Sequence, residues 1–249
     1  MGIIKFRKYN TIKSEEVRAV NKVMKSGILS DFFANKNKNF LGGKYVQKFE
    51  KDCKKYFKVK HAITVNSWTS GLVAIIGSLN VKPGDEIILS PWTMSACSSA
   101  IIHWGCIPVF SDIDEKTFNL DPKKIIKKIS KKTKAIMAID LFGQPCDMSE
   151  IRKICNDYNL KFICDSAQSI GAKYKNKYSS TAADVGGYSL NFHKHINTGE
   201  GGIIITNDAK IAKKCQLIRN HAEVTVDSYK TSDLSNMIGY NFRLTEIQA

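Results

Sequence analysis

Short apolar runs alternate with longer amphipathic segments along most of this chain, and this alternation constrains the fold more than any other feature. The runs are apolar throughout rather than at every second position, which is typical of strands in a parallel sheet that is buried on both faces. They are HAITV (61–65), DEIIL (85–89), IPVFSDI (107–113), KAIMAID (134–140) and KFICD (161–165). The pattern predicts an α/β fold, a three-layer sandwich in which helices flank a mostly parallel central sheet.

Helix signals lie between the runs and support the same fold. Asp121, directly before a proline, has the pattern of a helix N-cap. An amphipathic period over residues 14–27, ending in glycine, predicts a helix near the start of the chain. We therefore expect residues 1–40 to form an N-terminal helix and loop, and residues 41–249 to form the main domain.

The cysteines and the apolar segments bear on the compartment. The 7 cysteines are scattered singly, without a CxxC pair, which is typical of reduced thiols in a cytosolic protein. The N-terminus has no apolar core of signal-peptide length, and no segment approaches the roughly 18 apolar residues that span a bilayer. We expect a cytoplasmic protein with no membrane partner.

The formal net charge of +15 comes mostly from lysines spread in pairs along the predicted helices. A nucleic-acid-binding protein more often concentrates arginine and aromatic side chains on one face, so we expect no nucleic-acid partner. The same charge is compatible with a small substrate that carries phosphate.

Polar side chains follow several of the predicted strands, at the carboxyl ends where open α/β sheets bind ligands. Thr69 and Ser70 follow the first run and either belong to an ordinary helix N-terminus or hold a phosphate. Asp165 is either a helix N-cap or the partner of a protonated ring nitrogen. Trp92 and Met94 follow the second run and either belong to the core or cover a flat ring.

The segment NFHKHINTGEGG (191–202) places Lys194 between two histidines and allows two chemistries. His193 and His195 would share one face of a strand as metal ligands, but a metal site needs a further ligand, and the chain has no CxxC or HExxH motif. We expect no metal site. Lys194 instead suits attack on a carbonyl group. A phosphate site, a carboxylate for a ring nitrogen, a covering side chain and a reactive lysine are together what pyridoxal 5'-phosphate requires.

Longer motifs carry a family resemblance from about residue 26 to the last residue. They are GDEIILSPWTMSACSSAIIHWGCIPVFSDID (84–114), DLFGQPCDM (140–148), DSAQSIGA (165–172), YSLNFHKHINTGEGG (188–202) and GYNFRLTEIQA (239–249). With these motifs the chain resembles the large domain of the DegT/DnrJ/StrS family of pyridoxal-phosphate-dependent sugar aminotransferases, of fold type I. The resemblance implies transfer of an amino group from an amino acid, expected to be glutamate, to a keto group of a nucleotide-linked sugar. Such a reaction serves surface polysaccharide or amino-sugar biosynthesis.

The resemblance also implies roles for single residues near the reacting centre. Lys194 would form the covalent bond to the cofactor aldehyde and then move the proton between cofactor and substrate carbons. Asp165 would keep the cofactor ring nitrogen protonated, and Gln168 would contact the ring hydroxyl.

Further implied roles concern the cofactor phosphate and the assembly. Thr69 and Ser70, with Ser189, would hold the phosphate. Asn241 matches a family position that reaches the phosphate of the neighbouring subunit, so a homodimer is implied.

Three departures from the family pattern are visible. Met94 stands where an aromatic side chain usually covers the ring, with Trp92 two residues earlier. Trp68 replaces a small residue in the phosphate turn. The chain ends where family members continue into a smaller C-terminal domain, so we expect a large domain truncated before it, which binds the cofactor but transaminates weakly.

Two alternatives stay open at this point. The first is a pyridoxal-phosphate-dependent sugar dehydratase, for which the resemblance implies a histidine at the position of Lys194. The second is a truncated, non-catalytic remnant that acts as a binding or dimerising module.

Overall fold

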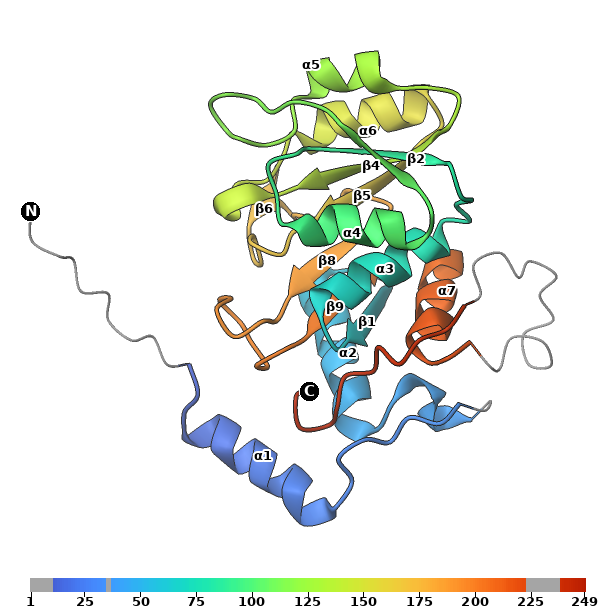
Figure 1. The fold of residues 1–249 in the computed structure, drawn as a ribbon. Helices are drawn as coiled ribbons and strands as arrows, with labels where there is room; N and C mark the ends of the chain where they lie inside the picture. Colours follow the sequence, from blue (N-terminus) through green and yellow to red (C-terminus); the bar gives the residue numbers. More distant parts are fainter. Residues whose placement is uncertain (1–10, 35–36, 223–237) are drawn as a thin grey trace, which may run out of the picture.

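The structure is a computed structural model that describes residues 11–34, 37–222 and 238–249 (Figure 1). Residues 1–10 of the expected N-terminal segment lie outside the described residues. The helices are α1 (Ser14–Ser26), α2 (Lys44–Phe57), α3 (Trp68–Ser78), α4 (Ser95–His103), α5 (Pro122–Ile125), α6 (Met148–Asp157) and α7 (Ala209–Arg219), with 3₁₀ turns η1 (Lys38–Leu41), η2 (Ile126–Lys128) and η3 (Leu141–Gly143). The strands are β1 (His61–Val65), β2 (Glu86–Leu89), β3 (Ile107–Phe110), β4 (Thr133–Ile139), β5 (Lys161–Asp165), β6 (Lys173–Tyr174), β7 (Lys177–Tyr178), β8 (Val185–Ser189) and β9 (Gly202–Thr206).

The described residues form a 7-stranded sheet with the order β1-β9-β8-β5-β4-β2-β3. Strands β8, β5, β4, β2 and β3 pair in parallel, and only β9, which is antiparallel to both β1 and β8, reverses the direction. The mostly parallel sheet expected from the apolar runs is therefore confirmed. A separate hairpin of β6 and β7 projects from the segment between β5 and β8.

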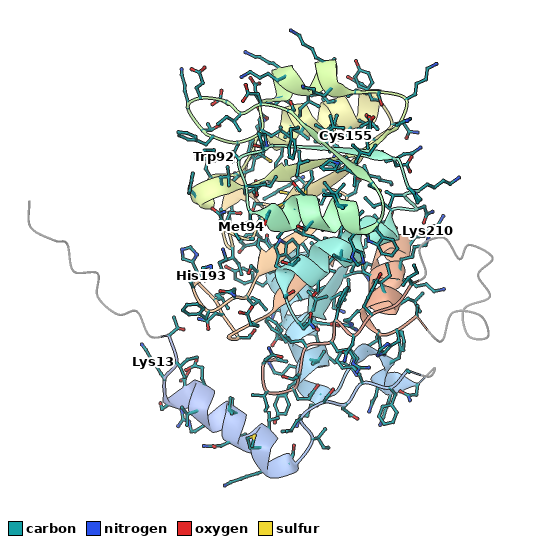
Figure 2. All side chains as sticks on the ribbon, viewed as in Figure 1. Lys13, Trp92, Met94, Cys155, His193 and Lys210 are labelled. Atoms are coloured by element: carbon teal, nitrogen blue, oxygen red, sulfur yellow. The ribbon has the colours of Figure 1, made fainter. Side chains whose placement is uncertain are left out.

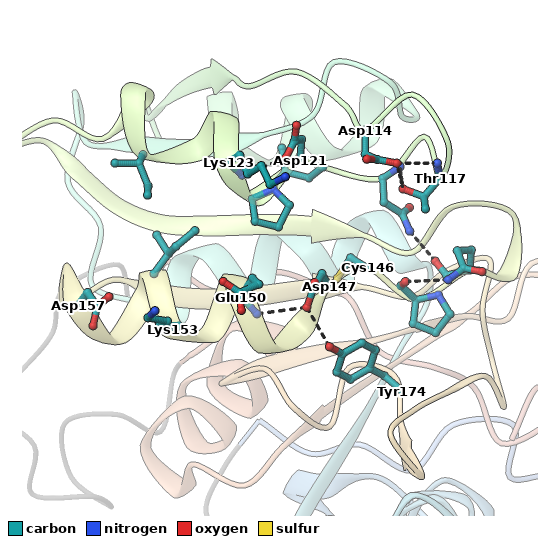
Figure 3. A pocket seen from close by; sticks show the side chains of 17 residues that line it. Asp114, Thr117, Asp121, Lys123, Cys146, Asp147, Glu150, Lys153, Asp157 and Tyr174 are labelled. Carbon is teal, nitrogen blue, oxygen red and sulfur yellow. Dashed lines mark hydrogen bonds between the residues drawn. The ribbon is translucent and has the colours of Figure 1, made fainter.

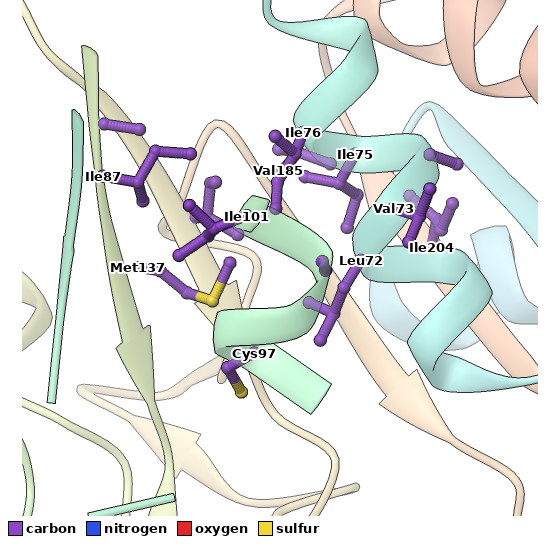
Figure 4. Packing of buried hydrophobic residues seen from close by; sticks show 14 of the residues in the cluster. Leu72, Val73, Ile75, Ile76, Ile87, Cys97, Ile101, Met137, Val185 and Ile204 are labelled. Atoms are coloured by element: carbon purple, nitrogen blue, oxygen red, sulfur yellow. The ribbon is translucent and has the colours of Figure 1, made fainter. Parts of the chain in front are cut away.

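Helices cover both faces of the sheet. Helices α3, α4 and α7 pack on one face, where Leu72 and Ile101 lie with Met137 and Val185 of the sheet in one buried cluster (Figure 4). The opposite face carries two further clusters, one beneath α5 and α6 and one beneath α2. Successive strand residues point to opposite faces, so a strand covered on both sides must be apolar at every position. This explains the continuous runs and confirms the three-layer sandwich.

Strand β3 departs from this rule. It forms the edge of the sheet beside β2, and its Ile107 and Phe110 are each 45% exposed. The sequence run was apolar throughout and predicted burial on both faces. An edge strand has a neighbour on one side only, so the flanking helices do not cover it fully.

The segment just before α2 and the last residues of the chain meet at the start of α2. Helix α1 extends away from the sheet (Figure 1), whereas Phe40 of η1 is buried beside Leu217 at the end of α7. The Glu246 carboxylate accepts hydrogen bonds from the N–H groups of Gly43 and Tyr45, at 3.1 and 2.7 Å. Turn η1 thus packs on the main body, and the last residues cap the N-terminus of α2.

Two observations bear on the expected compartment. All the cysteines are buried free thiols, and burial raises the pKa of Cys53 and Cys155 to about 12. These thiols are therefore protonated at neutral pH. Within the described ranges, we find no helix whose length and apolar character would carry it across a bilayer.

Candidate active site

A cavity of about 390 Å³ opens where the strands β1, β4, β5 and β8 end. These strands run in one direction, so the residues that follow them meet at one edge of the sheet. Six of the predicted site residues line this cavity: Thr69, Met94, Asp165, Gln168, Ser189 and Lys194. In Figure 2, Met94 and His193, which also lines the cavity, lie on the same side of the molecule.

Three predicted site residues do not line the cavity. The Ser70 N–H donates to Ser67 Oγ at 3.1 Å, and the two hydroxyls lie 2.8 Å apart. Trp92 is 52% exposed, with its ring centroid 6.1 Å from that of Phe118. Asn241 is exposed and forms an isolated β-bridge with the end of α7. Its contact with a neighbouring subunit stays a prediction.

The N-terminus of α3 forms one end of the cavity. Ser67 is its N-cap, because its hydroxyl accepts the N–H of Ser70, so the ordinary capping interpretation holds for this pair. A helix leaves its first N–H groups without intrahelical acceptors, and its dipole favours an anion there. Thr69 lies exposed in this first turn, and Ser189 at the end of β8 also lines the cavity. This end of the cavity therefore suits a phosphate group.

Asp165, the last residue of β5, lies deeper in the cavity and is 4% exposed. Its Oδ1 accepts the indole N–H of Trp68 at 2.7 Å and the backbone N–H of Ala167 at 3.0 Å. Its Oδ2 accepts the thiol of Cys97 at 3.2 Å. Burial raises the pKa of Asp165 above its ordinary value, although these hydrogen bonds act in the opposite direction. The nearby charge of Asp140 also raises the pKa.

Lys194 lies in the loop between β8 and β9, which is held together by hydrogen bonds between its own residues. The Asn191 side-chain amide donates to both carboxylate oxygens of Glu200, at 2.8 and 2.9 Å. The Lys194 N–H donates to the Asn191 carbonyl at 2.9 Å. These bonds fix the loop so that the half-buried Lys194 lines the cavity, whereas His195 is exposed and does not. Within the described part of the chain, the Lys194 ammonium makes no hydrogen bond or ion pair.

The side-chain amide of Gln168 has a fixed orientation. Its Oε1 accepts the backbone N–H of Phe142 at 2.9 Å. Phe142 has a positive φ of 53° inside η3. Because Oε1 is occupied by a donor, the NH₂ group of Gln168 is the half left to donate to a ligand oxygen.

The sequence did not indicate the roles of several residues of this site. Trp68 was noted only as a departure, and Cys97, Asn191 and Glu200 were not assigned to the site at all. Trp68 and Cys97 contact Asp165 across 97 and 68 sequence positions, and no local pattern marks such pairs. The bond between Asn191 and Glu200 spans only 9 positions, so their place at the two ends of the loop was a usable signal.

A second, larger hollow of about 600 Å³ lies between α5 and α6 (Figure 3). One of its charged residues, Asp147, has a structural role: it caps α6 by accepting the N–H of Glu150 at 3.2 Å, and it accepts the hydroxyl of Tyr174 at 2.8 Å. The residues that line it include no buried carboxylate, and its buried polar residue, Asn119, already bonds the Leu141 N–H and the Gln144 carbonyl at 3.0 and 2.9 Å. We therefore place the candidate active site at the smaller cavity.

The two histidines beside Lys194 do not form a metal group with other described residues. The potential metal-ligand atoms that cluster in the described ranges belong to Asp140, Cys146 and Cys164, which are all buried. His193 and His195 are both exposed and lie outside that cluster.

The donor set of the cavity fits pyridoxal 5'-phosphate. The end at α3 offers N–H groups and hydroxyls to a phosphate. The cavity also contains the buried carboxylate of Asp165, whose described partners include no cation, which suits a protonated ring nitrogen. The ammonium of Lys194, without a partner among the described residues, suits an aldehyde. Each polar part of the cofactor thus has a complementary group on the cavity wall.

Comparison with known proteins agrees with this geometry. The chain is 38% identical over 207 residues to GDP-perosamine synthase of Caulobacter vibrioides, an alignment that covers 83% of this chain and 55% of that protein. The aminotransferase from Psychrobacter cryohalolentis superposes with a TM-score of 0.85 at 30% identity, over 98% of this chain and 61% of its own. GDP-4-keto-6-deoxy-D-mannose-3-dehydratase of Escherichia coli, solved with hydrated PLP, superposes with a TM-score of 0.83 at 28% identity, over 96% and 64% of the two chains. The chain spans about half the length of several curated relatives that it matches.

The fold is therefore shared by transaminases and a dehydratase, so it does not distinguish the two reactions. The sequence match is more specific. The model of one protein family aligns with residues 10–249, which include the loop of Lys194 and the strand end at Asp165. The chain belongs to the DegT/DnrJ/EryC1/StrS aminotransferase family.

Proposed function

We propose that this chain is the cofactor-binding part of a pyridoxal-phosphate-dependent enzyme that transfers an amino group from an amino acid to a keto group of a nucleotide-linked sugar. The observation that carries the proposal is the cavity in which Lys194, Asp165 and the N-terminus of α3 meet. The relatives support the substrate class, because they include GDP-perosamine synthase and a dTDP-3-amino-3,6-dideoxy-α-D-galactopyranose transaminase.

When bound, pyridoxal phosphate supplies the carbonyl that reacts with amines and the ring that withdraws electrons. Asp165 holds a proton on the ring nitrogen, because its buried carboxylate is stabilised by a positive partner. Gln168 donates from its NH₂ group to the ring oxygen, while Phe142 holds the amide in place. Thr69 and Ser189 bind the phosphate at the end of α3.

Lys194 would be the residue that holds the cofactor covalently, through its Nζ. Its Nζ, when not engaged in that bond, would move a proton between the substrate carbon and the cofactor carbon in each half of the reaction. The loop closed by Asn191 and Glu200 keeps this amine at the cavity wall during both steps.

The remaining expectations belong to the same proposal. Glutamate is the amino donor, the enzyme acts as a cytoplasmic homodimer, and Asn241 reaches the phosphate of the neighbouring subunit. Residues 41–249 form the cofactor-binding domain. Met94, which is 68% exposed at the cavity, covers the cofactor ring, with Trp92 beside it.

The test is an absorption titration of the purified chain with pyridoxal phosphate, followed by borohydride reduction and peptide mass mapping. We expect a visible band that borohydride removes, with the reduced cofactor attached to Lys194. Lys194→Ala abolishes this attachment. Lys210→Ala, which removes an exposed lysine of α7 (Figure 2), is the matched control and leaves it unchanged. Addition of glutamate to the unreduced complex then reports whether this donor reacts.

Attachment to other lysines, or no attachment in a folded chain, would contradict the proposal and favour a non-catalytic binding or dimerising module. The dehydratase alternative has less support, because a lysine stands where that chemistry is expected to use histidine, and His195 does not line the cavity.

A further inference from the structure

Trp68 stands where the family pattern has a small residue, yet its indole is built into the candidate site. It is the first residue of α3, is 7% exposed, and lines the cavity. Its Nε1–H donates to Asp165 Oδ1 at 2.7 Å, the shortest of the hydrogen bonds to this carboxylate. A hydrogen bond to a charged acceptor is among the stronger ones in proteins.

Three glycines lie against Trp68, one in α3 itself and two in the neighbouring strands β8 and β9. A Cβ at Gly187 of β8 would lie 2.7 Å from the indole atoms Cη2 and Cζ3. A Cβ at Gly202, the first residue of β9, would lie 3.0 Å from the Cα and N of Trp68. A Cβ at Gly71 would lie 2.9 Å from Cε3. A Cβ at Gly71 would collide with the indole, and a Cβ at Gly187 would collide with it and with the Ile203 carbonyl. The glycines at these two positions therefore leave the space that the indole occupies.

The donors around Asp165 are distributed unequally between its two oxygens. Oδ1 accepts two N–H groups, those of Trp68 and Ala167. Oδ2 accepts only the thiol of Cys97, and S–H is a weak donor. Burial raises the pKa of the Cys97 thiol, so the sulfur keeps its proton beside the carboxylate. Oδ2 therefore retains the greater capacity to accept a further, stronger donor.

We propose that Trp68 is a positioning residue, whose indole N–H holds Asp165 Oδ1 so that Oδ2 is presented to the protonated ring nitrogen of pyridoxal phosphate. This inference rests on the proposed function, because it assigns a ligand atom to the same cavity. The indole acts on the cofactor through the carboxylate. Removal of the N–H should therefore weaken the binding of only those ligands that carry the ring nitrogen.

The first test compares two tryptophans that are matched in burial. Trp68→Phe keeps an aromatic ring and removes the donor. Trp104→Phe is the control, because Trp104 is also 7% exposed and its Nε1–H donates at 2.8 Å, but to the Val73 carbonyl in the core rather than to Asp165. We expect Trp68→Phe to raise the dissociation constant of pyridoxal phosphate about tenfold, and Trp104→Phe to change it less than about twofold.

A cofactor analogue separates positioning from general damage to the site. In 1-deazapyridoxal 5'-phosphate a C–H group replaces the ring nitrogen, while the aldehyde, the hydroxyl and the phosphate remain. We expect the unaltered chain and Trp68→Phe to bind this analogue equally. In the Asp165→Ala background, Trp68→Phe has no further effect on the affinity for pyridoxal phosphate.

A second measurement does not depend on the folding of the Trp68 variant or on the cofactor. The chain contains 3 tryptophans, so ¹⁵N labelling of tryptophan gives 3 indole N–H resonances. We expect Asp165→Asn to shift the Trp68 indole resonance upfield, because the charged acceptor is lost, and to leave those of Trp92 and Trp104 in place.

The outcomes are distinguishable. If the unaltered chain does not bind pyridoxal phosphate, the proposed function fails and this inference fails with it. If the unaltered chain binds it, and Trp68→Phe either binds equally well or loses the same factor for the deaza analogue, the inference alone is overturned. The inference is also overturned if the chemical shift of the Trp68 indole N–H is the same in Asp165→Asn as in the unaltered chain.

Discussion

Asp140 and Asp165 are buried carboxylates at the ends of adjacent parallel strands, yet they differ in their hydrogen-bond partners and in their access to the cavity. Ile139 of β4 pairs with Asp165 of β5, and the Asp140 N–H donates to the Asp165 carbonyl at 2.9 Å. Asp140 is fully buried, whereas Asp165 is 4% exposed and lines the cavity. The two acids thus have nearly the same place in the sheet and differ in which side of it they face.

The partners of Asp140 belong to the fold around it. Its oxygens accept the backbone N–H of Cys146 at 2.9 Å and the hydroxyls of Ser166 and Ser169 at 2.7 and 3.1 Å, with the thiol of Cys164 at 3.6 Å. Apart from Cys164 of β5, these donors come from the loops that follow β4 and β5, so the carboxylate ties the two loops together. Burial with satisfied hydrogen bonds therefore indicates structure at Asp140.

Asp165 has fewer donors and an open side. Burial raises its pKa, which means that its charged form is not fully compensated by the protein. A carboxylate in this condition gains from a cation that enters the cavity. Burial alone therefore does not mark an acid as part of a binding site. A buried acid is a candidate when its remaining acceptor capacity faces a cavity.

The largest expected effect comes from removal of the structural acid. Asp140→Ala leaves the Cys146 N–H and two hydroxyls without their acceptor inside the protein, so we expect the free energy of unfolding to fall by about 3 kcal/mol. Asp165→Ala should lower it by only about 1 kcal/mol, because water in the cavity reaches the freed donors. Urea unfolding followed by circular dichroism measures both. Equal losses would remove the distinction between the two acids.

A smaller effect is expected on cofactor binding, where substitution of Asp165 should cost more than substitution of Asp140. Asp165→Asn keeps the shape of the side chain but offers no charge to a protonated ring nitrogen. We expect the dissociation constant of pyridoxal phosphate to rise about tenfold, which is about 1.4 kcal/mol. Asp140→Asn, in the fraction that folds, should bind the cofactor like the unaltered chain. A change at Asp140 as large as that at Asp165 would contradict the assignment of the ring-nitrogen partner.

The smallest effect is a dependence of stability on pH in the cofactor-free chain. The folded-state pKa of Asp165 is raised above its ordinary value of 3.8, mainly by burial. The contribution of this group to stability is therefore fully present below about pH 4 and is lost as the pH rises through the folded pKa. Asp165→Asn does not titrate, so its stability relative to the unaltered chain should increase between pH 4 and pH 7. Urea unfolding at both values checks the sign, and a decrease would show that the hydrogen bonds outweigh burial.

The fold was predictable from the sequence to the level of its layers. The continuous apolar runs indicated strands covered on both faces, and the structure confirms the parallel sheet between two helical layers. The exposure of β3 was not predictable, because an edge strand and a central strand of a parallel sheet differ in their neighbours rather than in their own residues. The order of strands is set by pairing between distant segments, which leaves no local pattern.

For the site, the sequence indicated most of the residues and few of their contacts. Lys194, Asp165 and Gln168 stand in motifs at strand ends, so their meeting in one cavity followed from the parallel direction of the strands. Ser70 was named with them; its hydroxyl lies 2.8 Å from that of Ser67, and its contact with a phosphate stays a prediction. Capping and anion binding use the same residue types at the same place, so the sequence alone did not separate them.

The sequence by itself determined that this chain forms an α/β sandwich and which chemical groups lie at the ends of its strands, because periodicity and local motifs act over a few residues. Only the tertiary structure decided which acid faces the cavity and which donors hold it. Trp68 and Asp165 are 97 positions apart, and their bond depends on the sheet order that brings α3 over β8 and β9 and on glycines that admit the indole. Contacts of this kind are fixed by packing between distant segments, which a linear pattern does not record.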